Sequence, residues 1–392
     1  MRLSRVDRVV LAGVTLGLFS ISIPAFVTYR PNRLAAGESL NLWSAIGAWA
    51  ILFYLLWLSL VIVVPLVKND TARNAATGVL ANALFVLGFL FAGIAATDLA
   101  SSENPFARTS LAAGFWLNTL AAYIVLVFAR QNLGQDRVLG TITTYAGFGG
   151  AALLAAGGFV NELSIMQELV NNEERFIAEA LRHLTLSGIA VTIGSVIGVT
   201  LGIIAFKNRA SERPAFLFVN FVQTIPSLAL FGLMIAPLAY FSDTVPFLRQ
   251  LGVEGIGTAP ALIALTLYSL LPITRNTFTS LSIIPSGVID AGFGMGMSRR
   301  QLLIKVQIPL ALPVVLTGVR TSAVQAIGNT TVAALIGAGG LGTFVLQGLG
   351  QAAPDLILLG AISIIFIALA ADTALQALIT ALTPKGVSGA AQ

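Results

Sequence analysis

The segment IGAWAILFYLLWLSLVIVVPLV, residues 46–67, contains no charged side chain. A helix needs about 20 consecutive apolar residues to cross the hydrocarbon core of a bilayer, so this segment predicts a transmembrane helix. The whole chain has the same character, with 56% hydrophobic and 10% charged residues, whereas soluble domains carry about 25% charged residues. We therefore predict an all-α, polytopic membrane protein and not a large soluble helical protein.

Apolar runs between charged breaks predict about ten transmembrane helices, in two groups of five. The charged segment between the groups, residues 161–183, places its apolar residues at helical spacing and is expected to form an amphipathic surface helix. The sequence thus predicts an N-terminal membrane block at 1–160 and a C-terminal core at 184–383. The expected spans are 9–29, 45–67, 76–97, 110–129, 138–160, 184–206, 215–241, 258–274, 310–336 and 356–383.

Lysine and arginine residues predict the orientation of these spans, because cytoplasmic loops of membrane proteins are enriched in both. With a cytoplasmic N-terminus, 15 basic side chains lie in the inner segments and six in the outer ones. Acidic side chains show the opposite distribution, five inside and eleven outside. We therefore expect both termini in the cytoplasm and the segment 161–183 outside it. The net charge of +5 reflects this topology and does not require a nucleic-acid partner.

The inner loop at residues 275–309 is longer than the others and reads RNTFTSLSIIPSGVIDAGFGMGMSRRQLLIKVQIP. Pro285 is expected to open a short helix that ends in a glycine-rich turn. Ser298 and Gln301 have the spacing of a capping box, which predicts the start of a second helix, and Pro309 is expected to end it. Two short helices that carry apolar side chains fit the groove of a partner protein.

This loop resembles the signature of the inner-membrane permeases of binding-protein-dependent ABC importers. Their pattern is Glu-Ala-Ala, three residues, Gly, nine residues, and then Ile-x-Leu-Pro. The chain keeps this spacing, with Asp for Glu, Gly for the second Ala, Val for Ile and Ile for Leu. The matching residues, which the resemblance assigns to ATPase coupling, are Asp290, Ala291, Gly292, Gly296, Val306, Ile308 and Pro309.

The resemblance implies that a coupling helix at about 286–297, within the loop 286–309, seats in a separate ATPase subunit. That partner would use the ATP, and this chain would bind no cofactor. The resemblance also implies a five-helix type I ABC importer permease core, an extracytoplasmic substrate-binding protein, a second permease copy or paralogue, and a bacterial inner membrane. The chain lacks the G-x-x-x-x-G-K-[ST] phosphate loop, so we expect a transport subunit and not an enzyme.

Within these importers, residues 178–383 resemble the osmoprotectant subgroup, which takes up glycine betaine, choline and similar compounds. The extra N-terminal spans resemble a longer-permease branch of that subgroup. Methionine-type permeases share the general plan, so another small solute such as an amino acid is an alternative. The stretches that carry the resemblance are HLTL at 183–186, QTIPSLAL at 223–230, YSLLPITR at 268–275, GVRT at 318–321 and IGAGGLG at 336–342.

Polar residues inside the expected spans are costly in lipid and usually face a cavity or a partner. Gln223, Thr224 and Pro226 interrupt the seventh expected span. A kink there would expose backbone carbonyls, so these three residues are candidates for the lining of a translocation path.

Three polar residues of the ninth expected span are further candidates. Arg320 lies deep in the span and is expected to bond backbone carbonyls or an acid such as Asp372, with direct substrate contact as the alternative. Asn329 and Thr330 form a polar step, which either bonds a neighbouring helix or lines the path.

A proton- or sodium-coupled secondary transporter is the main competing function. Proton coupling normally needs acidic residues within the spans, and only Asp372 lies clearly within one. A membrane enzyme fits the sequence poorly, because the chain has a single histidine, His183, and no cysteine. We therefore expect no catalytic residues and no metal site.

Overall fold

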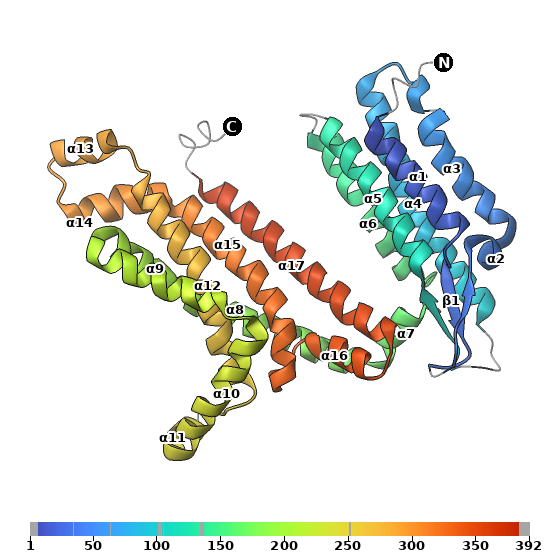
Figure 1. Ribbon diagram of the computed structural model, residues 1–392. Helices are drawn as coiled ribbons and strands as arrows, with labels where there is room; N and C mark the ends of the chain where they lie inside the picture. The colour runs from blue at the N-terminus through green and yellow to red at the C-terminus, as the bar shows by residue number, and fades with distance from the viewer. Residues whose placement is uncertain are drawn as a thin grey trace. The chain divides into compact units, whose positions relative to one another are not determined.

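Helices form most of the regular structure of the chain in this computed structural model (Figure 1). The structure describes residues 7–33, 35–62, 64–100, 104, 106–133, 137–250 and 252–383. The chain divides between Asn171 and Asn172 into two compact units.

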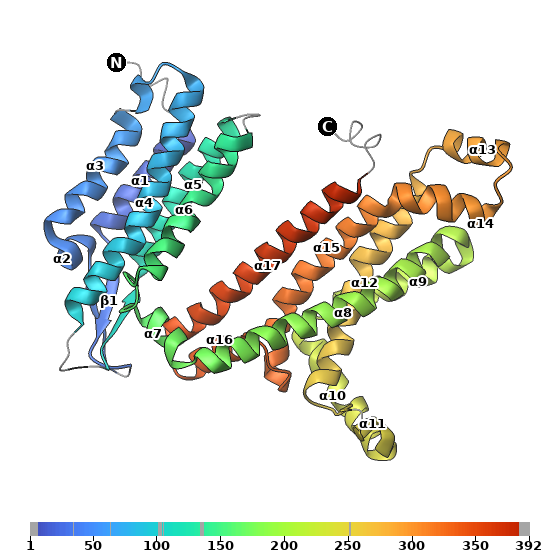
Figure 2. The ribbon, with the colours of Figure 1, turned by 180° about the vertical axis from the view of Figure 1, so that it is seen from behind.

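The first unit is a helical bundle with a small antiparallel sheet at one end (Figures 1 and 2). Its helices are α1 Arg8–Ser22, α2 Leu42–Ile46, η2 Gly47–Trp49, α3 Ala50–Ile62, η3 Val64–Leu66, α4 Asp70–Leu99, α5 Ala113–Asn132, α6 Arg137–Ala156 and α7 Ser164–Asn171. The strands are β1 Val27–Arg30, β2 Glu38–Leu40 and β3 Arg108–Leu111, in the order β2-β1-β3. Val27 of β1 lies opposite Leu40 on one side and Leu111 on the other.

Aromatic side chains fill the core of the first unit. Phe26, Phe53, Phe115 and Trp57 are fully buried, and the ring of Phe26 packs edge-on against both other phenylalanines. The indole Nε1 of Trp57 donates a hydrogen bond to Oδ1 of Asn118, 3.1 Å away. Because lipid offers no hydrogen-bond partner, this internal pairing allows both polar groups to be buried.

The sheet was not expected from the sequence, and it shortens the first predicted span. The prediction extended that span from 9 to 29, but α1 ends at Ser22. Pro24 has no N–H with which to continue the helix, and Thr28 and Tyr29 are residue types that favour strands. The chain therefore leaves the helix and pairs with β2 and β3, which adds a small sheet to an otherwise helical fold.

The second unit contains the helices that follow Asn172. They are α8 Glu173–Lys207, α9 Arg209–Thr224, α10 Ser227–Thr244, α11 Pro246–Gln250, α12 Thr258–Ser282, α13 Ser286–Gly294, α14 Arg299–Leu302, η4 Leu303–Gln307, α15 Ile308–Ala333, η5 Ala334–Ile336, α16 Gly342–Gly350 and α17 Pro354–Leu382. In both views α13 and α14 lie at one end of this unit, and α11 and α16 lie at the other (Figures 1 and 2).

A row of glycines on α8 lets α12 pack closely against it. Gly194, Gly198 and Gly202 recur every four residues, and a Cβ on Gly202 would lie only 2.6 Å from Cβ of Thr277. Small residues at such an interface allow helix backbones to approach each other in a membrane. The α8–α12 pair is thus the structural centre of the second unit.

Eight helices of the described chain are long and apolar enough to cross a membrane, judged by length and composition, which confirms a polytopic membrane protein. Three of the ten expected spans do not match one of these eight helices in full. The first corresponds to α1, which has 15 residues. The seventh is divided between α9 and α10, of which α10 is one of the eight. The eighth corresponds to α12, which has 25 residues but is rich in Ser and Thr. The eight are Leu42–Leu66, Asp70–Leu99, Ala113–Asn132, Val138–Ala156, Glu173–Lys207, Ser227–Thr244, Arg299–Ile336 and Pro354–Leu382.

The segment 161–183 does not form one surface helix. It contains the short helix α7, and its second half is the beginning of α8, which continues without a break to Lys207. The stretch from Glu173 to Ser187 holds no proline or glycine, so nothing in the sequence stops this helix before the apolar run begins.

Candidate coupling and translocation sites

The predicted coupling helix corresponds to α13, which begins after Pro285. Helix α12 continues to Ser282, so the connection is shorter than the expected loop 275–309. Asp290 and Ala291 are exposed on α13, and Phe293 and Met295 expose 44% and 71% of their surface. This end of the unit therefore presents a short helix with a carboxylate and apolar side chains available to a partner.

Two glycines of this region have different structural roles. Gly292 is buried, and a Cβ on it would overlap Cδ1 of Leu302, so it allows α13 to pack on α14. Gly296 has φ of +79° and ends the helix, with its N–H donating to Phe293 and that of Met297 donating to Gly292. This is a Schellman cap, which favours glycine at the left-handed position.

The second short helix forms as the sequence predicts, but it does not end where expected. Ser298 and Gln301 form the capping box, with N–H to side-chain distances of 2.8 and 3.3 Å. The helix then continues from α14 through η4 into α15, and Pro309 lies in the first turn of α15.

A π-helical turn explains why Pro309 does not break this helix. In η4 the N–H of Ile308 donates to the carbonyl of Leu303, five residues earlier. A wider turn shifts the hydrogen-bond register, and so it accommodates the donor that proline lacks. Val306, Ile308 and Pro309 are therefore part of a continuous helix that joins the coupling region to a span.

The break between α9 and α10 opens a pocket of about 430 Å³. Pro226 disfavours helical geometry at the residue before it, and Ile225 is extended, with ψ of 124°. Two bonds to Tyr268 of α12 hold the break: Nε2 of Gln223 donates to the Tyr268 carbonyl at 2.7 Å, and the Tyr268 hydroxyl donates to the carbonyl of Ile225. The pocket is lined by Gln223, Ile225, Pro226, Ser227, Tyr268, Gln325, Gly328 and Asn329.

Three of the candidate path residues, Gln223, Pro226 and Asn329, line this pocket together. Thr224 and Thr330 do not line it. Their hydroxyls donate to carbonyls of their own helices, those of Phe221 and Ala326.

Sequence reasoning did not select the other lining residues, among them Tyr268, Ser227 and Gln325. One signal was present, because Gln325 precedes Asn329 by four residues and so lies on the same helix face. None of the eight lining residues is charged.

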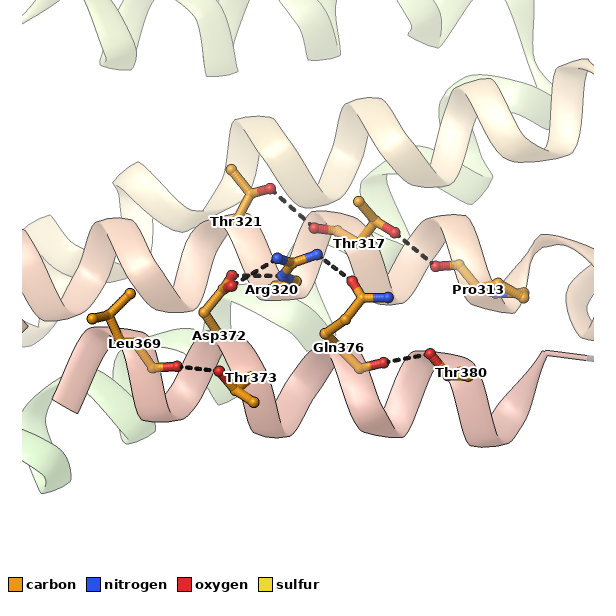
Figure 3. A network of polar contacts seen from close by, with 9 residues as sticks. All are labelled: Pro313, Thr317, Arg320, Thr321, Leu369, Asp372, Thr373, Gln376 and Thr380. Carbon is orange, nitrogen blue, oxygen red and sulfur yellow. Dashed lines mark hydrogen bonds and ion pairs between the residues drawn. The ribbon is translucent and has the colours of Figure 1, made fainter. Parts of the chain in front are cut away.

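Arg320 lies outside the pocket and pairs with α17, as the sequence predicts (Figure 3). Its Nε and Nη2 donate to the two carboxylate oxygens of Asp372 at 2.5 and 2.7 Å, and Nη1 donates to Gln376. Asp372 and Gln376 are four residues apart and share one face of α17. Two spanning helices, α15 and α17, are thus linked by a bidentate charged contact.

Comparison with known proteins gives the same two parts of the chain. Residues 5–166 match the family model described as the N-terminal domain of the ABC transporter permease YehY. Residues 190–386, half of the chain, match the model of the binding-protein-dependent transport system inner membrane component.

Two individual relatives agree with this result. The osmoprotectant import permease protein OsmW of Salmonella typhimurium is 40% identical over 219 residues, which cover 56% of this chain and 97% of that protein. The choline transport system permease protein OpuBB of Bacillus subtilis is 35% identical over 223 residues, 57% of this chain and 95% of that protein. The solved structure of the MetNI methionine ABC transporter is 24% identical, with a TM-score of 0.47, and covers 53% of this chain and 96% of that chain.

The spanning helices and the coupling region at α13 and α14 thus define a membrane-spanning subunit of a transport system. The chain belongs to the family of binding-protein-dependent transport system inner membrane components. It is accordingly a multi-pass inner-membrane permease and not an enzyme, and its family implies two partners, a separate ATPase that hydrolyses ATP and a substrate-binding protein.

Proposed function

We propose that this permease forms the translocation path for a small osmoprotectant such as glycine betaine or choline, and that the pocket at the α9–α10 break is part of that path. The observation that carries the proposal is the pocket itself. It lies in the same unit as the coupling helix, and amide, hydroxyl and carbonyl groups line it without any charged side chain.

A neutral, polar pocket suits a solute that must enter and also leave. Conduction requires binding that is favourable at each site but weak enough for release. A quaternary ammonium group is bound tightly by a cage of several aromatic rings, whereas this pocket contains the single ring of Tyr268. Tight selection of the solute is therefore assigned to the extracytoplasmic binding protein, and the names of the relatives support an osmoprotectant as the solute.

The complex that we propose contains two permease subunits, either two copies of this chain or this chain and a paralogue. The ATPase would bind at α13, and the permease would bind no cofactor. Both termini would be cytoplasmic. The end of α17 and the junction of α8 and α9 lie at the same end of the second unit as α13 (Figures 1 and 2), which supports this orientation for the C-terminus.

The test is uptake into proteoliposomes that contain this chain, its ATPase and its binding protein. We expect ATP-dependent uptake of radiolabelled glycine betaine or choline, and no uptake driven by a proton or sodium gradient alone. Accumulation of an amino acid in place of both osmoprotectants would identify a different solute. Uptake by this chain alone on an ion gradient would contradict the whole proposal.

Variants of the pocket test its role in the same assay. Asn329→Ala and Gln325→Ala each remove one polar group from the lining, and loss of one hydrogen bond typically changes binding by about threefold to tenfold. We expect a rise of that size in the solute concentration for half-maximal uptake. Gln351→Ala, on an exposed residue after α16, is the matched control.

A further inference from the structure

Three neighbouring residues on one face of α8 lie against the end of α15 and the segment that follows it. Glu179, Arg182 and His183 are spaced three and four residues apart, so their side chains point the same way. They lie near the start of α8, at the end of the second unit opposite α13 (Figures 1 and 2).

Glu179 holds a loop of left-handed glycines. The N–H of Gly340 donates to Oε2 of Glu179 at 2.5 Å, a bond that the negative charge of the carboxylate strengthens. Gly339 and Gly340 are buried and have φ of +79° and +90°. A Cβ on Gly339 would lie 2.7 Å from Cδ of Arg182 and 2.9 Å from the same Glu179 oxygen. Glycine is thus needed here both for its conformation and for the close approach of α8.

His183 holds α15 itself. It is fully buried, and its Nε2 lies 2.9 Å from the carbonyl oxygen of Ile327. Because a carbonyl only accepts hydrogen bonds, Nε2 carries the proton in this contact. Ile327 directly precedes Gly328 and Asn329, which line the pocket, so the imidazole is bonded to the turn of α15 that forms the pocket wall.

The same segment is also bonded to the start of α12. The N–H of Gly257 donates to the carbonyl of Ile336 at 2.7 Å, and Nη2 of Arg182 lies 3.4 Å from Oγ1 of Thr258. Helix α8 and the two helices α12 and α15, which both line the pocket, are therefore joined at one end by bonds that mostly involve backbone groups.

We propose that Glu179 and His183 are positioning residues for the pocket: they fix the place of the Gly328–Asn329 turn relative to α8 and α12. The inference rests on the proposed function for its meaning in transport, but its geometry can be measured independently of any solute. Removal of His183 takes away the bond at Ile327 of α15, and removal of Glu179 takes away the bond at Gly340 in the segment that follows α15.

The absence of cysteine in the natural chain allows a direct measurement. An Asn329→Cys permease carries a single thiol on the pocket wall, and its rate of reaction with a small maleimide reports the accessibility of that wall. We expect His183→Leu and Glu179→Ala to change this rate at least about threefold in the assembled complex. His183→Gln keeps an N–H donor and Glu179→Gln keeps an oxygen acceptor, so both should stay near the parental rate.

Glu174→Ala is the matched control, since this exposed glutamate lies at the start of the same helix and should leave the rate unchanged. Equal rates in the parent, His183→Leu and Glu179→Ala would overturn the inference. If Glu179→Ala does not accumulate, Glu179→Asp withdraws the carboxylate by one methylene and gives the same test.

Transport kinetics separate the inference from the proposed function. In the full complex, without the Cys substitution, we expect His183→Leu to raise the solute concentration for half-maximal uptake about tenfold, with recovery in His183→Gln. An altered thiol rate in a complex that transports no osmoprotectant would refute the proposed function and keep the positioning role. A normal thiol rate with normal osmoprotectant uptake would refute the positioning role alone.

Discussion

At the scale of single residues, the contact between Arg320 and Asp372 is the most unusual feature of the spans. Each charge alone would be costly within the membrane, and together they form a bidentate pair whose geometry matches the guanidinium fork. The side-chain oxygen of Gln376 accepts a hydrogen bond from Nη1, the third nitrogen of the Arg320 guanidinium group. One face of α17 thus provides partners for all three guanidinium nitrogens of Arg320. These bonds join α15 and α17 at this position.

This arrangement predicts that removal of one partner does more harm than removal of both. Arg320→Leu leaves the carboxylate of Asp372 without its cation, and Asp372→Leu leaves the guanidinium without its anion. The double variant leaves neither charge, and replacing a pair by apolar residues is often neutral. In detergent, we expect both single variants to lower the thermal unfolding temperature by a few degrees, and the double variant to regain most of that loss. Additive losses would show that the two side chains do not interact.

At the scale of elements, the contact of α8 with α12 depends on the absence of side chains. A Cβ on Gly202 would lie 2.9 Å from the carbonyl oxygen of Thr274, and a backbone atom cannot move aside as a side chain can. Gly188, on the same helix, has no atom within 4 Å of its Cβ position. The two glycines therefore provide a matched pair of sites.

We predict that Gly202→Val destabilises the second unit by about 1–3 kcal/mol, the usual cost of overpacking. Gly188→Val should cost much less, because its added atoms point into open space. Thermal unfolding of both variants in detergent checks this difference. Equal losses would indicate that helix propensity, and not the α8–α12 contact, decides the effect.

The coupling helix gives a second prediction at this scale. Gly294 is the last residue of α13, and its Cβ position is open, so Gly294→Glu places a charge on the surface proposed to bind the ATPase without straining the Gly296 cap. We expect Gly294→Glu to lower ATPase co-purification at least about tenfold, because burial of an unpaired charge is costly. Gly294→Ala is the control, and unfolding temperatures should be similar for both. Normal recovery of the ATPase with Gly294→Glu would mean that the partner binds elsewhere.

The elements that the sequence predicted well are those with local causes. Apolar runs define most spans, Pro226 marks the break before α10, and Ser298 with Gln301 marks the start of α14. The missed features depend on distant partners. The pairing of β1 with β3 joins residues 27 and 111, and the place of Tyr268 in the pocket follows from its bonds to residues 223 and 225. The effect of Pro309 was predicted wrongly, because the π-helical turn before it accommodates a residue without a backbone N–H. No local sequence pattern indicates that turn.

At the scale of the whole molecule, the orientation of the chain in the membrane determines whether α13 faces the side on which the ATPase lies. The basic side chains predict cytoplasmic termini, and this prediction requires that the chain be outside the cytoplasm at the boundary between the units. Helix α8 begins there. It has 35 residues, a length of about 52 Å, against a hydrocarbon core of about 30 Å. It is therefore long enough to place its two ends on opposite sides of the bilayer.

Two reporter positions, at Asn171 before α8 and at Asn208 after it, test this orientation with one helix between them. We expect a reporter that is active only outside the cytoplasm to function at Asn171 and to be silent at Asn208, and a cytoplasmic reporter to give the reverse. The physical reason is the charge distribution, since Lys207, Arg209 and Arg213 flank Asn208 and favour the cytoplasm. The reversed pattern at both positions would place α13 outside, where no ATPase could reach it, and would contradict the coupling role. The same signal at both positions would show that α8 does not cross the bilayer, although its length and composition satisfy the requirement for a span.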